Sequence, residues 1–237
     1  MTSRPVSIGL AGWSEAVSRY RSAFPADGSG LTRYSGTFNF VEVNVTFYRA
    51  VREATFASWA EQTPADFRFS VKLNRSVTHA ARLSENARLE EALQPMRALS
   101  DKLAALLIQL PPTLDFDPAR AEAFLARLRG LYAGTVAWEP RHPGWASAEA
   151  ESLLAAHQVT PVLTEIPTPH TPHAPGGDYV RLHGTPRRYR SSYPTDQLRA
   201  LAAWIAEGTS PAYVVFDNTA GPAGVANGQE LQELLGA

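Results

Sequence analysis

Cysteine is absent from this chain of 237 residues. Its absence excludes disulfide bonds, thiolate nucleophiles, zinc fingers and cysteine-ligated iron–sulfur clusters. The chain also lacks any apolar run close to the roughly 20 residues with which a helix crosses a bilayer. Because no long apolar segment precedes the first strand-like run, we see no secretory signal and expect a cytoplasmic protein with no membrane partner.

A net excess of charge is missing as well. The formal net charge is −1, and 19% of the residues are charged. This balance gives no support for bulk binding of a polyanion, but it is compatible with a local basic patch. The sequence shows no internal repeat, domain linker or long charge run, so we expect residues 1–237 to form one domain.

Strand-like apolar runs alternate with helix-periodic segments along the whole length. The expected strands cover residues 6–11, 40–44, 67–72, 105–110, 135–139, 159–164, 179–183 and 212–217. Eight such strands with helical connections predict an α/β fold, a single (β/α)8 TIM barrel. The alternative is an open doubly wound sheet, but no glycine-rich phosphate loop follows the first strand.

The connections between these strands carry helix signals. Expected helices cover residues 15–24, 54–62, 85–102 and 229–235, and the third of these should break near Pro95. Two further helices should begin after the N-caps Asp117 and Ser147, and another should contain the apolar residues at 198–205. The connection between the sixth and seventh strands departs from this scheme. Residues 167–177 contain four prolines, which predict a loop without a helix.

The segment VEVNVTFYR, residues 41–49, is the most informative stretch of the chain. Its alternation predicts a buried strand that ends in functional groups, with Glu42 and Asn44 on one face. A carboxylate buried among β-branched residues is costly without partners. An edge strand with a solvated face is the other interpretation, but polar residues recur at the ends of other strands, which favours a site.

In a TIM barrel, catalytic groups lie at the carboxyl ends of the strands and in the loops that follow. Polar residues at those positions therefore predict a pocket. The expected catalytic residues are Glu42, Lys72, His79, Glu139 and His183. The expected substrate-binding residues are Asn44, Tyr48, Arg49, Gln109, Arg141, Arg181, Asp217 and Asn218.

Some of these residues have a structural alternative. Glu42 is as compatible with a buried ion pair, to Lys72 or Arg181, as with catalysis. Gln109 is as suited to hydrogen bonds with loop backbone groups as to a ligand.

Positive charge collects in the predicted loops, at Arg49, Arg52, Arg75, Arg82, Arg141, Arg187, Arg188 and Arg190. A basic mouth favours a small anionic molecule as the partner, and solvated loop arginines are the alternative. His170 and His173 have a spacing seen in metal sites, but they lie in the proline-rich segment, so we expect no metal there.

The motifs resemble those of a known family. Residues 9–13 (GLAGW) are similar to its opening motif, and residues 41–49 to its central signature. Further motifs follow in the family's order, at residues 67–72, 78–79, 109–112, 139–145, 179–184 and 216–219. Together they resemble the domain of unknown function family 72, the YecE-like proteins, over nearly the whole chain.

This resemblance implies a TIM barrel and no established activity. Two positions depart from the family pattern. Glu165 stands where aspartate is usual, and Asp217 stands where asparagine is frequent. The second departure weakens any role that needs a neutral amide at that position.

We expect an enzyme, of hydrolase, lyase or isomerase type, that does acid–base chemistry on a small anionic or polyhydroxylated substrate. Glu42 and Glu139 would form a carboxylate pair, and His79 or His183 would carry a proton. One rival is a barrel that cleaves or binds nucleic acid, with a divalent metal as an option. The other rival is a ligand-binding protein without catalysis. The sequence indicates neither the cofactor nor the oligomeric state.

Overall fold

The computed structural model describes residues 4–84 and 86–236. Within them, parallel strands follow one another in the order β1 to β8 and form a closed barrel, which confirms the predicted TIM barrel. The strands are β1 Val6–Leu10, β2 Phe40–Val43, β3 Arg68–Lys72, β4 Leu103–Gln109, β5 Thr135–Glu139, β6 Thr160–Leu163, β7 Asp178–Leu182 and β8 Ala212–Phe216.

The strand expected over residues 40–44 is present and ends one residue early, at Val43. The chain turns instead into a short helix, α3, Val45–Tyr48. The hydroxyl of Thr46 lies 3.0 Å from the backbone oxygen of Val43 and 2.7 Å from that of Lys72. This hydroxyl satisfies backbone groups where β2 ends, and alternation of apolar residues alone cannot reveal such a contact.

Helices and turns form most of the connections. They are α1 Ser14–Arg19, η1 Arg21–Ala23, α2 Gly30–Ser35, α4 Glu53–Glu61, the π-helical turn η2 Ser76–Ala80, α5 Asn86–Leu93, η3 Gln94–Lys102, α6 Pro118–Leu131, η4 Pro143–Ala146, α7 Ala148–Ala156, α8 Thr195–Glu207 and α9 Ala223–Leu235. None of the helices in the described part of the chain is long and apolar enough to cross a membrane.

Three helix predictions need correction or qualification. The helix expected over residues 15–24 is wrong beyond Arg19, and the sequence pattern does not predict α2 at all. The break near Pro95 is confirmed, because α5 ends at Leu93 and η3 follows; residue 85 lies outside the described residues. Helix α9 begins earlier than expected, at Ala223.

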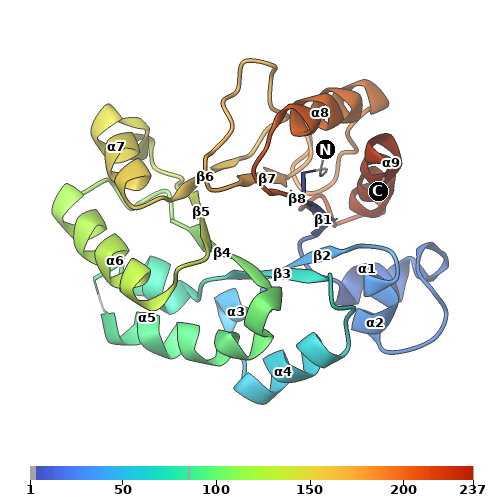
Figure 1. Ribbon diagram of the computed structural model, residues 1–237, viewed down its shortest axis with the longest axis horizontal. Helices are drawn as coiled ribbons and strands as arrows, with labels where there is room; N and C mark the ends of the chain where they lie inside the picture. Colours follow the sequence, from blue (N-terminus) through green and yellow to red (C-terminus); the bar gives the residue numbers. More distant parts are fainter. Residues whose placement is uncertain (1–3, 85, 237) are drawn as a thin grey trace. The chain divides into compact units, whose positions relative to one another are not determined.

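Two compact units make up the chain. The first unit holds residues 4–42, 62–68 and 162–236, and the second holds residues 43–61, 69–84 and 86–161. In the first unit β7, β8 and β1 are hydrogen-bonded neighbours, and α8 and α9 pack against each other, as Figure 1 shows in orange and red. In the second unit β4 pairs with β3 and β5. The expectation of one domain stays a prediction.

Residues 164–177, all of them described, connect β6 to β7 without a helix, which confirms that prediction. The indole nitrogen of Trp204, on α8, donates to the backbone oxygen of Thr171 at 2.9 Å. The rings of Trp204 and His173 stack with centroids 4.2 Å apart, and Nδ1 of His173 lies 2.6 Å from a carboxylate oxygen of Asp178. These contacts give His173 a structural role in fastening the loop.

Helix α6 offers a test of local stability. The backbone N–H of Arg120 donates to the side chain of Asp117 at 3.0 Å, as predicted for an N-cap, and this bond is the main cause that lowers the pKa of Asp117. The ionised cap therefore stabilises the folded state above the ordinary pKa, and this contribution is lost as the pH falls through the lowered value.

We expect Asp117→Ala to lower the melting temperature at pH 7 by several degrees, measured by circular dichroism. Asp117→Asn keeps an acceptor and should lower it less; equal loss in both variants would contradict the capping role.

Candidate active site

Arg181 is at the centre of a buried polar group in the first unit. It lies on β7 between Tyr179 and His183, and alternation along the strand places the three side chains on one side of the sheet. Asp217 directly follows β8, the strand beside β7, and Glu42 lies on β2. No member of this Arg181 cluster is more than 9% exposed.

Glu42 holds the guanidinium of Arg181. Nε of Arg181 donates towards both carboxylate oxygens at 3.1 Å, and Nη2 donates to Oε1 at 2.9 Å. The hydroxyl of Tyr179 donates to Oε2 at 2.9 Å. A bidentate pair of this kind is strong and directional, and it engages the oxygens that would otherwise accept a proton. These contacts favour the buried ion pair with Arg181, which is one of the two interpretations that the sequence left open for Glu42.

Asp217 connects Arg181 to His183. Its Oδ2 lies 3.2 Å from Nη1 of Arg181 and 2.7 Å from Nδ1 of His183. An ionised carboxylate only accepts hydrogen bonds, so Nδ1 carries the hydrogen and Nε2 is the nitrogen that can exchange a proton. A carboxylate orients the catalytic imidazole in the same way in hydrolases of several folds.

The loop after β7 covers His183 with an aromatic ring. Tyr189 is 43% exposed, and its ring meets that of His183 edge-on with centroids 5.7 Å apart. Further along the loop, the hydroxyl of Tyr193 accepts a hydrogen bond from the backbone N–H of Gly184 at 2.8 Å. Burial raises the pKa of Tyr193, and nearby negative charges add to this effect, so its hydroxyl stays neutral.

Asn218, expected to bind substrate, is fully buried at the base of the same loop. Its Nδ2 donates to the backbone oxygen of Ser191 at 2.9 Å and to Oδ1 of Asn227 at 3.1 Å. Asn227 in turn bonds to both the backbone N–H and the backbone oxygen of Tyr193, at 3.0 and 2.9 Å. The two amides therefore hold the loop in place.

The second unit contains a different polar group at the ends of β3 and β4. Nζ of Lys72 donates to Oε1 of Gln109 at 2.7 Å. The same nitrogen lies 4.3 Å from the centre of the Phe47 ring, which is a cation–π distance. The ring of His79 meets the Phe47 ring edge-on, with centroids 5.0 Å apart. We refer to these four residues as the Lys72 cluster.

His79 is presented to this cluster by the π-helical turn η2. Turns of this type are rare and are frequently found at functional sites. Nδ1 of His79 lies 2.9 Å from the hydroxyl of Thr78, which is fully buried. Burial lowers the pKa of His79, and the positive charges of Lys72 and Arg75 lower it further, so the imidazole is neutral at neutral pH.

Glu139 ends β5 directly beside Gln109 of β4. It is 1% exposed, and its carboxylate forms an ion pair with the guanidinium of Arg141. Asn44 lies just before α3, at its N-terminal boundary. The expected pairing of Glu139 with Glu42 as two catalytic carboxylates stays a prediction.

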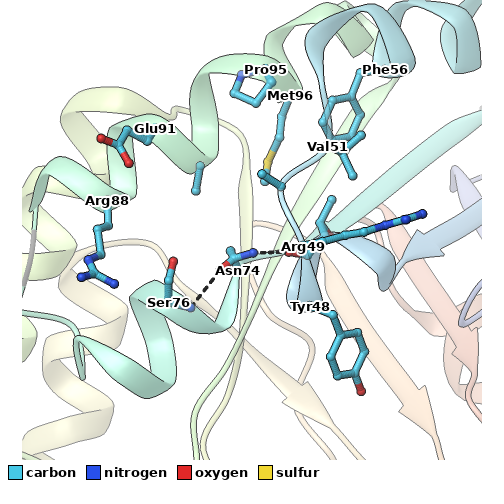
Figure 2. A pocket seen from close by; sticks show the side chains of 13 residues that line it. Tyr48, Arg49, Val51, Phe56, Asn74, Ser76, Arg88, Glu91, Pro95 and Met96 are labelled. Carbon is cyan, nitrogen blue, oxygen red and sulfur yellow. Dashed lines mark hydrogen bonds between the residues drawn. The ribbon is translucent and has the colours of Figure 1, made fainter.

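Tyr48 and Arg49 take a different position in the second unit. They line a cavity of about 280 Å3 together with residues of α4, α5, η2 and η3, and Figure 2 shows this cavity. Its lining includes neither Lys72 nor His79. This position favours a role for Tyr48 and Arg49 that differs from that of the strand-end residues.

The structure thus assembles two sets of the predicted residues. Glu42, Arg181, His183 and Asp217 form one set, and Lys72, His79 and Gln109 form the other. The prediction that members of both sets share one pocket stays a prediction.

Two residues of these clusters, Tyr179 and Phe47, were not predicted as site residues from the sequence. Tyr179 precedes Arg181 by two residues, and that spacing on a strand could have identified it. No pattern in the sequence singles out the ring of Phe47.

A metal-dependent mechanism needs several ligands in one place. Within residues 4–84 and 86–236, no group of three or more His, Asp or Glu side chains could hold a metal ion. The metal-dependent alternative therefore gains no support from the arrangement of these side chains.

The fold agrees with what comparison with known proteins finds. A family model described as "Protein of unknown function DUF72" matches residues 7–237, and the chain belongs to this family. The UPF0759 protein YecE of Escherichia coli K12 is 34% identical over 131 residues, which are 53% of this chain and 47% of YecE. The matched region thus spans about half the length of that relative.

Two other relatives match over nearly their whole length. The UPF0759 protein YunF of Bacillus subtilis is 25% identical over 269 aligned positions, which cover 97% of this chain and 94% of YunF. The crystal structure of a DUF72 family protein from Thermotoga maritima superposes with a TM-score of 0.77 at 25% identity and covers 99% of this chain and 100% of its own. The names of these relatives state no activity.

The ion pair between Glu42 and Arg181 can be tested by Glu42→Gln. Glutamine keeps the shape of the side chain but leaves the guanidinium charge without its main partner. Removing one member of a buried pair costs about 3–5 kcal/mol. We therefore expect the free energy of unfolding in urea to fall by that amount. Glu207→Gln, at an exposed position of the same unit, should leave it unchanged. If Glu42→Gln were as stable as the wild type, Glu42 would return to the catalytic candidates.

His79 predicts a pH dependence of stability. Its folded pKa lies below the ordinary value of 6.5, so the unfolded chain binds the proton more readily. The neutral ring therefore stabilises the folded state fully above pH 6.5, and this contribution is lost as the pH falls below that value. We expect His79→Gln to flatten the dependence of unfolding free energy on pH between 6.5 and about 5. An unchanged slope in the variant would show that His79 titrates alike in both states.

Proposed function

We propose that this protein is an enzyme that does acid–base chemistry on a small, hydroxylated, anionic substrate. His183 would take a proton from the substrate through Nε2, and Asp217 would orient the imidazole. The observation that carries this proposal is the 2.7 Å contact between Nδ1 of His183 and Oδ2 of Asp217, beside a guanidinium held by Glu42.

The charges of the Arg181 cluster suit a histidine that gains and loses a proton. Glu42 and Arg181 offset each other in a bidentate pair, which leaves the carboxylate of Asp217 to balance a protonated His183. A base that is held in one tautomer loses little free energy in reorientation when it reacts. Nη1 of Arg181 lies 3.4 Å from Nδ1 and 3.5 Å from Nε2 of His183, so its positive charge would also stabilise a negative charge that develops on the substrate.

The loop after β7 supplies cations for an anionic group of the substrate. Arg187, Arg188 and Arg190 are exposed, and no residue in the described part of the chain forms an ion pair with them. The guanidinium of Arg188 lies 5.1 Å from the ring centre of Tyr189, and this ring meets His183. A carboxylate or phosphate bound by this loop would therefore bring the attached hydroxyl groups towards His183.

The proposal is tested by proton NMR in D2O with panels of 2-hydroxy acids, aldonic acids and sugar phosphates. We expect the wild type to exchange or convert a member of one panel. His183→Gln should slow this reaction by on the order of 100-fold or more, the usual contribution of a general base. His170→Gln, at an exposed position in the same unit, is the control and should react as the wild type does.

Three outcomes would contradict the proposal. Saturable binding of a panel member without turnover would indicate a ligand-binding protein. Binding of DNA that weakens steeply with salt, without reaction of the panels, would favour the nucleic-acid alternative. Turnover that survives in His183→Gln with an unchanged melting temperature would move the chemistry to other residues, with Lys72 and His79 the next candidates.

A further inference from the structure

The loop after β7, residues 183–194, holds Tyr189 in a backbone conformation that tyrosine rarely adopts. Its φ is 66°, in the left-handed region that favours glycine. Hydrogen bonds on both sides keep it there, because its N–H donates to the backbone oxygen of His183 and its own oxygen accepts from the N–H of Ala220 at 3.0 Å. Strained residues persist where the surrounding contacts over-determine them, and they cluster at ligand sites. The conformation of Tyr189 therefore favours a functional role for its side chain.

The ring of Tyr189 is presented to solvent beside the proposed base. It is 43% exposed, it meets the ring of His183 edge-on, and the guanidinium of Arg188 lies 5.1 Å from its centre. An exposed aromatic ring offers a ligand a rigid apolar face. Because His183 is only 7% exposed, a ligand that reaches it contacts this ring on the way.

Arg187, Arg188 and Arg190 lie in one hydrogen-bonded turn. The backbone oxygen of Arg187 accepts from the N–H groups of Arg190 and Ser191 at 3.0 and 2.9 Å, and the N–H of Arg187 donates to the hydroxyl of Ser191 at 3.0 Å. Residues 184–195 include no Asp or Glu, so the loop itself does not balance these three positive charges. A phosphate monoester matches the turn better than a carboxylate, because it brings about two negative charges near neutral pH and three terminal oxygens.

Glu165 adds a carboxylate beside this loop. It follows β6 by two residues, and β6 pairs with β7. Burial raises the pKa of Tyr193, and the negative charges of Glu165 and Asp217 raise it further, so Glu165 lies near the residue whose hydroxyl anchors the loop. The side chain of Glu165 is exposed, and an exposed carboxylate accepts hydrogen bonds from the hydroxyl groups of a ligand.

We propose that the loop after β7 recognises the phosphate monoester of a cyclic sugar. The phosphate binds at the three arginines, the apolar face of the sugar ring lies on Tyr189, and sugar hydroxyl groups bond to Glu165. The hydrogen bonds of Asn218 and Asn227 hold the loop in advance, which lowers the entropic cost of binding. Because the sugar phosphate is then the substrate of His183, the assignment rests on the function proposed above and narrows its substrate to one class.

Isothermal titration calorimetry with ribose 5-phosphate, glucose 6-phosphate and fructose 6-phosphate tests this assignment. We expect at least one of these probes to bind saturably. The sulfate ester of the same sugar carries a single negative charge, so it should bind about tenfold or more weakly. Glycerol 3-phosphate, which keeps the phosphate but lacks the ring, should also bind more weakly than the sugar phosphate.

Two variants and one control test the location. Arg188→Gln should weaken binding of the sugar phosphate by about tenfold or more, as expected when a charge-assisted contact is lost. Tyr189→Gly removes the ring but adopts the same φ without strain. It should bind the sugar phosphate about tenfold more weakly, with binding of glycerol 3-phosphate and the melting temperature little changed. Arg199→Gln, at an exposed position of α8, should bind as the wild type does.

The assignment is overturned if none of the three sugar phosphates binds saturably, or if the sulfate ester binds as tightly as the phosphate. Unchanged binding of the sugar phosphate by Tyr189→Gly would overturn the role of the ring. Turnover of a 2-hydroxy acid or an aldonic acid, in place of a sugar phosphate, would leave the function of His183 standing and overturn this substrate class. Sugar phosphate binding with the expected variant effects but without turnover would support recognition by the loop and contradict the role of His183.

Discussion

The buried guanidinium of Arg181 imposes the strictest physical requirement in the first unit. Removing such a charge from water costs several kcal/mol, and only a complete set of partners offsets that cost. Glu42 provides two acceptor oxygens, Asp217 provides a third, and the hydroxyl of Tyr179 completes the coordination of Glu42. His183 lies within this network, so its position is determined by the same ion pair.

Much of the barrel could be predicted from the sequence, because buried parallel strands are recognisable as short apolar runs. All eight strands lie within two residues of their expected bounds. The errors occur where short-range signals are weak. Helix α2 has only six residues and begins with glycine, behind the N-cap Ser29. The strand expected at residues 40–44 ends one residue early, where Thr46 bonds to backbone that includes a residue far along the chain, Lys72.

The site could be predicted only as a set of residues. Strand-end positions identified Glu42, Arg181, His183 and Asp217, but not which of them pair. The partner of Glu42 was open between Lys72 and Arg181, because strand order does not determine how far a side chain reaches. Which of these residues form hydrogen bonds with each other depends on distances of about 3 Å, and no sequence pattern encodes such distances. Residues 48 and 49 illustrate the same limit, since the turn of α3 places them at a cavity instead of at the strand ends.

The surroundings of His183 in the first unit differ from those of His79 in the second unit. In the first unit, a carboxylate next to the ring fixes the tautomer of His183. In the second unit, burial and the charges of Lys72 and Arg75 keep His79 neutral by lowering its pKa. A site that needs one tautomer of the ring is served by the first arrangement, because the neighbouring carboxylate accepts the hydrogen of Nδ1.

The most direct test is the tautomer of His183, measured by nitrogen-15 NMR of protein labelled in its histidine rings. If Asp217 orients this ring beside the pair of Glu42 and Arg181, the neutral imidazole should carry its hydrogen on Nδ1, and Nε2 should show the shift of an unprotonated nitrogen. A neutral ring with its hydrogen on Nε2 would contradict the arrangement, and with it the role of His183 as the base.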